Sequence, residues 1–210
     1  MIGVDKGLFI TFEGGEGAGK STLIDRVFVH LAMKGYLTIK TREPGGTKTG
    51  ELIRELLLHK KEVSLQARAE LLLFLADRAQ HVDEVILPAL KRGEIVLCDR
   101  FNDSTLAYQG GARGFDLSII ENLCRFASAE LPPQMTFYLD IDPRLGLERV
   151  KKSGVESDRI EAESLAFHDR IRTAYRAIVA REPHRVHLID ASASSDEVFQ
   201  KTIEKIDAAL

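Results

Sequence analysis

The glycine-rich segment at 14–21 constrains the fold of this chain more than any other part of its sequence. It is written G-G-E-G-A-G-K-S and fits the pattern G-x-x-x-x-G-K-[ST] at every fixed position. The apolar run at 8–13 predicts a strand before it, and the pattern at 20–34, ended by Gly35, predicts a helix after it. A strand, a tight glycine loop and a helix in this order predict the first unit of an α/β fold.

The same alternation of strand and helix patterns continues along the chain. Further apolar runs of strand length predict strands at 36–41, 94–99, 135–140 and 186–190. Helical patterns lie between them at about 50–58 and from 65 to about 92, where Pro88 interrupts the pattern and Gly93 ends it, and a last helix follows the fifth strand. We therefore predict an α/β fold with a five-stranded parallel sheet, helices on both faces and right-handed crossovers. Because no repeat or linker divides the 210 residues, 1–210 is predicted to form one domain.

The composition argues against several classes of protein. With 44% hydrophobic residues and a net charge of −3, the chain can form a core but lacks the basic excess of a general binder of nucleic-acid polymers. Its densest apolar stretch, 71–76, is too short to span a membrane, and Glu13 interrupts the N-terminal apolar run that a signal peptide needs. Cys98 and Cys124 form no C-x-x-C pair. We therefore expect a cytoplasmic protein without a nucleic-acid or membrane partner.

The glycine loop has the chemistry of a phosphate site. Its glycines allow successive backbone N–H groups to point at phosphate oxygens, and the start of the next helix adds a positive dipole end. Lys20 supplies a positive charge toward the β- and γ-phosphates, and the Ser21 hydroxyl can bind Mg²⁺. We therefore predict a nucleoside-triphosphate site at Gly14, Gly15, Glu16, Gly17, Ala18, Gly19, Lys20, Ser21 and Thr22.

A carboxylate at the end of a strand is the second residue expected at the metal. Asp99 ends an apolar strand, which is the usual place for a carboxylate that holds Mg²⁺ through water. Asp140 ends another such strand and is the alternative. Asp99 is preferred because Arg100 follows it directly and places a cation at the same end of the sheet.

Several classes of protein share this loop, and missing motifs separate them. The sequence has no N-K-x-D motif for reading guanine and no L-S-G-G-Q signature of transporter ATPases. It is also too short for a motor or a helicase core. A small kinase remains as the simplest interpretation.

The sequence resembles bacterial thymidylate kinases from end to end. The resemblance rests on F-E-G-G-E-G-A-G-K-S-T at 12–22, T-R-E-P-G-G-T at 41–47, A-E-L-L-L-F-L-A-D-R-A-Q-H at 69–81, D-R-F-N-D-S-T-L-A-Y-Q-G-G at 99–111 and D-R-I-E at 158–161. It implies a P-loop kinase that transfers the γ-phosphoryl group of ATP to dTMP with Mg²⁺, giving dTDP for dTTP synthesis. It also implies a five-stranded parallel sheet and a homodimer.

The resemblance implies residues for the acceptor phosphate and sugar. Arg100 is implied to grip the dTMP phosphate, which suits a guanidinium because it is always charged and can bind two oxygens. With Lys20 it is expected to be catalytic, although an isolated arginine would more often form a surface salt bridge. Glu16 is implied to accept a hydrogen bond from the 3′-hydroxyl of dTMP, and Glu43 is implied to belong to the same pocket.

The resemblance also implies a base pocket. Phe74 and Arg78 share one helix face and are implied to stack on thymine and to hydrogen-bond a base carbonyl, although Phe74 could equally be a core residue. Tyr108 is implied to crowd a ribose 2′-hydroxyl, with Gln109 and Ser104 near the base edge. By pattern alone, Tyr108 and Gln109 are expected in a loop, with a hairpin turn as the alternative interpretation.

A basic segment at about 144–160 resembles the lid that closes over ATP in family members without an arginine in the P-loop. Here Gly17 stands at the position of that arginine. A further catalytic cation is therefore expected from this lid segment, with Arg149 preferred and Arg159 second. The alternative is an exposed basic loop whose charges only offset nearby acidic residues.

Two other functions remain open at this point. One is a kinase for a different small acceptor, such as another nucleoside monophosphate or a deoxynucleoside. The other is a nucleotide-dependent switch or scaffold that binds ATP without acceptor chemistry.

Overall fold

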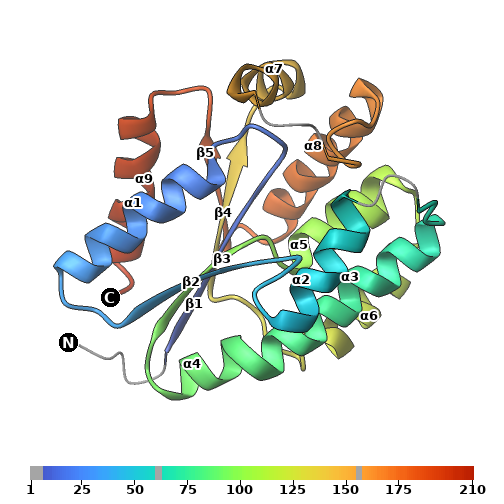
Figure 1. Ribbon diagram of the computed structural model, residues 1–210. Helices are drawn as coiled ribbons and strands as arrows, with labels where there is room; N and C mark the ends of the chain where they lie inside the picture. The colour runs from blue at the N-terminus through green and yellow to red at the C-terminus, as the bar shows by residue number, and fades with distance from the viewer. Residues whose placement is uncertain (1–6, 60–62, 155–157) are drawn as a thin grey trace.

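The computed structural model describes residues 7–59, 63–154 and 158–210. Five parallel strands form one sheet in the order β2-β3-β1-β4-β5 (Figure 1). Their bounds are β1 Leu8–Gly14, β2 Thr38–Arg42, β3 Ile95–Asp99, β4 Met135–Asp140 and β5 Val186–Asp190. The predicted α/β class, the five strands and their parallel arrangement are thus confirmed, and β4 and β5 have the predicted bounds.

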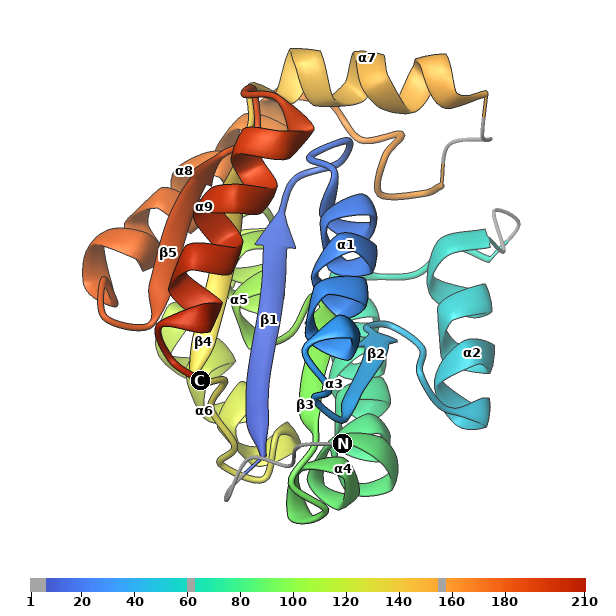
Figure 2. The same cartoon turned by 90° about the vertical axis from the view of Figure 1, so that its left-hand side faces the viewer.

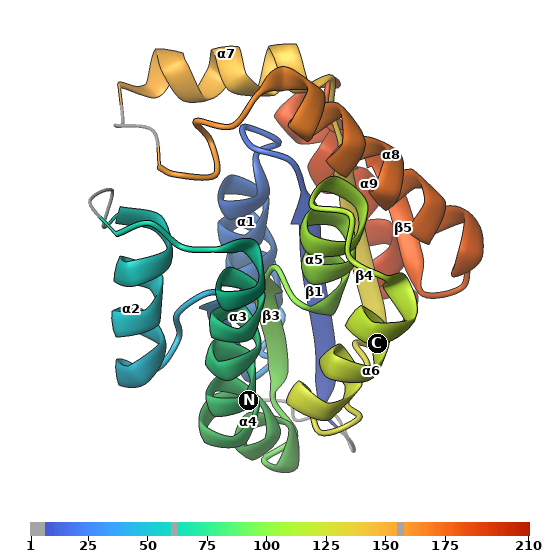
Figure 3. The same ribbon diagram turned by 90° about the vertical axis from the view of Figure 1, so that its right-hand side faces the viewer.

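Helices cover both faces of the sheet. Helices α1 (Lys20–Met33) and α9 (Ser195–Asp207) lie on one face, as Figure 2 shows. Helices α3 (Ala67–His81), α5 (Asn102–Thr105), α6 (Leu117–Ala127) and α8 (Leu165–Arg181) lie on the other, which faces the viewer in Figure 3. Helix α2 (Lys48–Arg54) packs beside α3 rather than on the sheet.

The alternation of side chains along the strands explains these two layers. Ile10 and Phe12 of β1 point to one face and pack in a core with α1 and α9. Phe9, one residue out of phase, belongs to a core on the opposite face. Because both faces are covered, the inner strands β3 and β4 are largely apolar and buried, as expected for a parallel sheet, whereas the edge strand β2 is mostly polar.

The helical pattern at 65–92 is not broken at Pro88. The chain passes from α3 through a π-helical segment, η2 (Val82–Ile86), into α4 (Leu87–Lys91). Pro88 lies in the first turn of α4, where a proline is tolerated. Helix α2 likewise continues as a π-helical segment, η1 (Glu55–His59).

The segment around Tyr108 is also helical, so the expected loop or hairpin turn is wrong. After α5 the chain continues as a π-helical segment, η3 (Leu106–Ala112), which packs against α8 and α6. Packing explains this helical conformation, because the apolar side chains of Leu106, Ala107 and Ala112 are buried in the core. This burial outweighs the preference of the neighbouring glycines for a turn.

The carboxyl ends of the strands meet the loops that carry the predicted site. Strand β1 runs into the glycine loop, and β3 runs into α5. Helix α7 (Pro143–Ser153), the first part of the lid segment, lies across the same end of the molecule (Figures 1 and 2). Among the described residues, no helix is both long and apolar enough to span a bilayer.

Candidate active site

A cavity of about 370 Å³ lies at the carboxyl ends of β1, β2 and β3. Most of the predicted site residues line it: Glu16, Gly17, Ala18, Gly19, Lys20, Ser21, Thr22, Glu43, Phe74, Arg78, Asp99, Arg100, Ser104, Tyr108 and Gln109. These residues come from four parts of the chain that are far apart in sequence. A cavity at this end of a parallel sheet is the usual place for a ligand in such a fold.

The P-loop, residues 14–21, wraps around the side chain of Lys20. The Lys20 Nζ donates to the carbonyl oxygens of Gly14 and Gly15, both at 3.1 Å. Burial lowers the pKa of Lys20, and the nearby positive charge of Arg100 lowers it further. Gly19, at φ 87°, precedes the first turn of α1, so a residue without a side chain is needed there. The amide groups and the lysine thus surround a space suited to phosphate oxygens.

Helix α7 packs directly on the P-loop through two glycines. A Cβ atom on Gly17 would overlap the carbonyl group of Gly146, and one on Gly146 would overlap the carbonyl oxygen of Glu16. Gly17 also has a φ of 67°, which L side chains rarely adopt. An arginine at position 17 is therefore incompatible with this seating of α7.

Ser21 and Asp99 form the predicted metal corner. The Ser21 hydroxyl donates to Asp99 Oδ2 at 3.2 Å, and Asp99 Oδ1 is buried without a hydrogen-bond partner among the described residues. A buried, unpartnered carboxylate oxygen beside a hydroxyl fits the oxygen ligands that Mg²⁺ prefers.

Asp140, the alternative carboxylate, is already paired. It accepts hydrogen bonds from Arg172, Arg176 and Tyr138 at 2.6–3.1 Å. Although burial alone would raise the pKa of Asp140, these donors hold it well below its usual range. The structure therefore favours Asp99 over Asp140 for a metal.

Arg100 is held at the centre of the cavity wall. Its backbone has a φ of 72°, and its Nη2 donates to Glu16 Oε1 at 2.8 Å. The Tyr108 hydroxyl donates to the same oxygen at 2.8 Å, and the guanidinium lies over the Tyr108 ring. Burial opposes the charged form of Glu16, but Arg100 and Lys20 outweigh it and lower the pKa of Glu16 to about 2. Glu16 and Arg100 thus form a hydrogen-bonded ion pair that lines the cavity.

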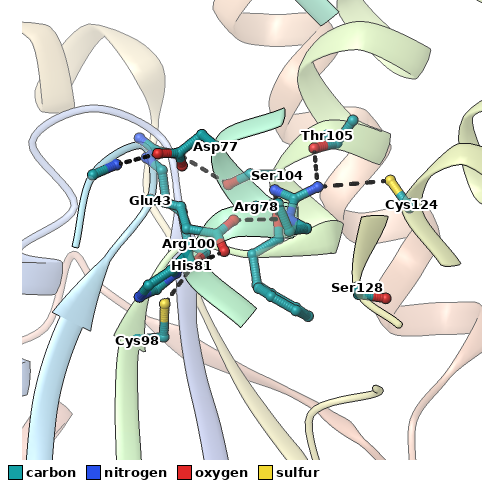
Figure 4. A network of polar contacts seen from close by, with 12 residues as sticks. Glu43, Asp77, Arg78, His81, Cys98, Arg100, Ser104, Thr105, Cys124 and Ser128 are labelled. Atoms are coloured by element: carbon teal, nitrogen blue, oxygen red, sulfur yellow. Dashed lines mark hydrogen bonds and ion pairs between the residues drawn. The ribbon is translucent and has the colours of Figure 1, made fainter. Parts of the chain in front are cut away.

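Arg78 lies on the cavity wall within a buried polar network (Figure 4). Its Nε donates to Glu43 Oε2 at 2.8 Å, its Nη1 to Thr105 Oγ1 at 2.8 Å and its Nη2 to the carbonyl of Phe101 at 3.0 Å. His81 Nδ1 lies 3.0 Å from the other oxygen of Glu43. Arg78 and Glu43 therefore also have a structural role, the stabilisation of this buried network, in addition to the substrate-binding role predicted from the sequence.

Phe74 and Gln109 complete the wall near Arg78. Phe74 is half-buried and both lines the cavity and packs against the core, so the two interpretations of this residue are compatible. Gln109 Nε2 donates to the buried Glu70 at 3.2 Å. Ring and amide together form a wall that fits one flat, hydrogen-bonding group.

The two lid arginines bind protein groups in this structure. Arg149 donates to the carbonyl of Ala191, after β5, at 3.0 Å. Arg159 donates to the carbonyl of Leu57 at 2.9 Å and to Glu70 at 2.7 Å. Within the described part of the chain, neither side chain lines the cavity, whereas Asp158, Ile160 and Glu161 do. Positions 155–157 of the lid segment lie outside the described residues.

Arg54, Leu58 and Thr105 line the cavity although the sequence analysis gave none of them a role, and Arg54 donates to the carbonyl of Pro44 at 2.9 Å. Arg42 and Pro44 also line it, and both belong to the turn after the second strand that the resemblance places at the acceptor pocket. Nothing local distinguishes Arg54 from the other charged residues of α2.

Comparisons with known proteins agree with this geometry. A family model described as thymidylate kinase matches residues 12–202. The chain is 51% identical over 209 residues to the thymidylate kinase of Protochlamydia amoebophila, with 96% of this chain and 93% of that protein covered. It is 48% identical over 206 residues to that of Shouchella clausii, with 98% and 97% covered.

A solved structure is similar over the same range. The crystal structure of thymidylate kinase from Ehrlichia chaffeensis superposes with a TM-score of 0.77 at 34% identity, covering 96% of this chain and 99% of that one. The P-loop, the metal corner and the arginine-lined cavity thus belong to a sequence that matches one family along nearly its whole length. The chain belongs to the thymidylate kinase family.

Proposed function

We propose that this chain transfers the γ-phosphoryl group of ATP to dTMP, giving dTDP and ADP. The main support is that one cavity joins the P-loop to a wall formed by Phe74, Arg78 and Gln109. The P-loop end suits a triphosphate, and the ring with its buried polar neighbours suits a flat base. Arg100 connects the two parts, because it bonds to Glu16 of the P-loop and to Ser104 at 3.3 Å.

The acceptor needs positioning rather than a general base. A phosphate monoester is already anionic near neutral pH, so its oxygen can attack without losing a proton to the protein. Arg100 would exchange part of its contact with Glu16 for the acceptor phosphate, while Glu16 remains available for a sugar hydroxyl. Lys20 and the P-loop amides would hold the donor phosphates and offset the charge on the transferred group.

A magnesium ion fits the corner formed by Ser21 and Asp99. The ion would draw its other ligands from water and phosphate oxygens, since the described residues contain no group of three or more His, Cys, Asp or Glu side chains that could hold a metal. When bound, Mg²⁺ neutralises charge on the donor phosphates. The unpartnered Asp99 Oδ1 is the observation that supports this assignment.

We also propose that the lid segment, 144–160, supplies the remaining catalytic charge within the single domain. Arg149 and Arg159 are the candidates, and each must leave its present carbonyl partner to reach the donor. The Gly17–Gly146 contact supports a lid source, because it excludes an arginine from position 17 of the P-loop.

A homodimer through α3 and α6 is a further part of the proposal. Leu72 of α3 and Leu117, Ile119 and Phe126 of α6 have large exposed fractions, up to 84% for Phe126. The two helices pack side by side, so these side chains can form one apolar face for a second copy. A cytoplasmic location is proposed on the free, buried Cys98 and Cys124, which suit a reducing compartment.

An acceptor panel tests the proposed function. ADP release with ATP and Mg²⁺ is measured with dTMP, dUMP, dCMP, dGMP, ribo-TMP and thymidine at matched concentrations. We expect the highest kcat/KM for dTMP. A higher kcat/KM for another nucleotide or for thymidine would contradict dTMP as the acceptor. A rate of ADP release that is the same with and without every acceptor would favour a switch or scaffold.

A further inference from the structure

Glu13 is a fully buried carboxylate at the end of β1 that does not line the cavity. From the sequence alone, Glu13 is expected only to end the strand at 8–13. In the structure, three donors from two other parts of the chain converge on it. Burial, together with the negative charge of Asp103, raises the pKa of Glu13 to about 7 despite these donors. A buried acid that is costly to ionise calls for an explanation of its position.

The first contact of Glu13 fixes the turn that carries Arg100. Its Oε1 accepts the backbone N–H of Phe101 at 2.7 Å. Arg100, just before, is left-handed at φ 72°, and its own N–H donates to the carbonyl of Phe12 at 3.0 Å. A left-handed arginine is unfavourable by itself, and the two hydrogen bonds from β1 on either side of it hold that conformation.

The second contact orients the hydroxyl of Ser104. Glu13 Oε2 accepts from Ser104 Oγ at 2.5 Å and from the Tyr175 hydroxyl at 2.7 Å. With its proton directed at Glu13, Ser104 presents lone pairs to its other neighbours. One of these is Arg100, whose Nη1 donates to Ser104 Oγ at 3.3 Å. Glu13 therefore acts on both the backbone and the side-chain partner of Arg100.

We propose that Glu13 is a positioning residue for the acceptor site: its carboxylate holds the left-handed turn at Arg100 and turns Ser104 into an acceptor for that arginine. This inference rests on the proposed role of Arg100 in holding the phosphate of dTMP. Because Glu13 does not line the cavity, its effect on the reaction passes through Arg100 and Ser104. The expected signature is a selective loss of dTMP binding.

E13Q is the most direct test, with D103N as the matched control. The glutamine keeps the shape and one acceptor but places N–H donors where Ser104 and Tyr175 also donate. Asp103 is a second buried acid nearby, bonded instead to Arg185 at 2.7 and 2.9 Å. D103N therefore removes a buried carboxylate that accepts from Arg185 and not from Phe101 or Ser104. Because the charge of Asp103 raises the pKa of Glu13, D103N also favours the carboxylate form of Glu13 that the proposal requires.

Calorimetry with dTMP and with ATP gives the readout. For E13Q we expect the Kd for dTMP to rise by about 10-fold or more and the Kd for ATP to stay within about threefold, as for a lost hydrogen bond of a charged group. For D103N, the Kd for dTMP and the Kd for ATP should both stay within about threefold of the wild type, even if its Tm falls as far as that of E13Q. If E13Q does not fold, E13D replaces it, since a shortened carboxylate draws away from Phe101 and Ser104 and predicts the same selective loss.

Two results would overturn the proposal. One is a dTMP affinity within about threefold of the wild type, and the other is an equal loss of ATP affinity, which indicates a general structural role. The wild type separates this claim from the proposed function. A wild type that binds ATP but not dTMP contradicts the acceptor, whereas a wild type and a variant that both bind dTMP normally contradict only the role of Glu13.

Discussion

Gly17 of the P-loop and Gly146 of α7 approach one another so closely that neither position has room for a Cβ atom. The contact couples the helix that begins the lid segment to the loop that holds the phosphates. It also gives a steric reason for the glycine at position 17.

G17A is predicted to destabilise the protein more than G19A. Both glycines have positive φ, 67° and 87°, so either alanine adds about 1–2 kcal/mol of backbone strain. Only the alanine at 17 also meets the Gly146 carbonyl, because a Cβ on Gly19 has no neighbour within 4 Å. Urea unfolding of the two variants without nucleotide measures the difference. Equal losses of unfolding free energy in G17A and G19A would mean that α7 moves away from the P-loop at no cost and is not packed firmly against it.

The lid arginines are predicted to act mainly on kcat. Removing a cation that stabilises the transferred phosphoryl group lowers kcat by about 10³-fold or more. We therefore expect R149A or R159A to show a large part of this decrease in kcat. The KM for dTMP should change much less, because the contact forms in the transition state. Steady-state kinetics of both variants and the double variant test this. If all three keep kcat within about tenfold of the wild type, roughly 1.4 kcal/mol, the lid is not the source.

R78A is predicted to weaken the fold as well as dTMP binding. Arg78 and Glu43 form a buried ion pair with exposed fractions of 2% and 3%. Removing Arg78 leaves the buried Glu43 with His81 as its remaining side-chain partner among the described residues, and costs about 3–5 kcal/mol. Replacing both partners, as R78M/E43Q, should recover most of that loss while dTMP binding stays weak. Chemical unfolding and dTMP calorimetry on both variants separate the two effects. A double variant no more stable than R78A would show that the pair is not the cause.

Asp77 is predicted to make the fold less stable as the pH rises. Burial, together with the charge of Glu43, raises the pKa of Asp77 from 3.8 to about 7. The native state therefore binds more protons than the unfolded chain between about pH 4 and pH 7, and the unfolding free energy falls across that range by at most about 1.4 kcal/mol per pH unit. In D77N this contribution disappears. The unfolding free energy of the wild type minus that of D77N should fall as the pH rises to 7 and then stay constant. A difference that is flat from pH 4 to 7 would contradict the raised pKa.

The strands and the P-loop could be predicted because their signals are local. The apolar runs at 135–140 and 186–190 mark β4 and β5 at their observed bounds, and the spacing of 14–21 defines the phosphate loop. The periodic spacing of apolar residues and the spacing of glycines can be recognised within a short stretch of sequence, without knowledge of distant contacts.

The rest of the site depends on contacts between distant segments. Nothing near Glu13 in the sequence indicates Phe101 or Tyr175, which lie 88 and 162 residues away. The helical conformation at Tyr108 is likewise set by packing against α8 and α6 rather than by its glycine-containing sequence. The partners of Arg149 and Arg159 could not be predicted for the same reason, since each contacts a carbonyl from a different element.

Transfer of label from γ-labelled ATP tests the central claim most directly. With Mg²⁺ and dTMP, the wild type should place the label in dTDP, and without dTMP the label should stay in ATP. R100A should bind ATP normally but transfer label at least about 100-fold more slowly, because the guanidinium that holds the acceptor phosphate is gone. Release of label as inorganic phosphate at one rate with and without dTMP, or an R100A variant as fast as the wild type, would contradict the account.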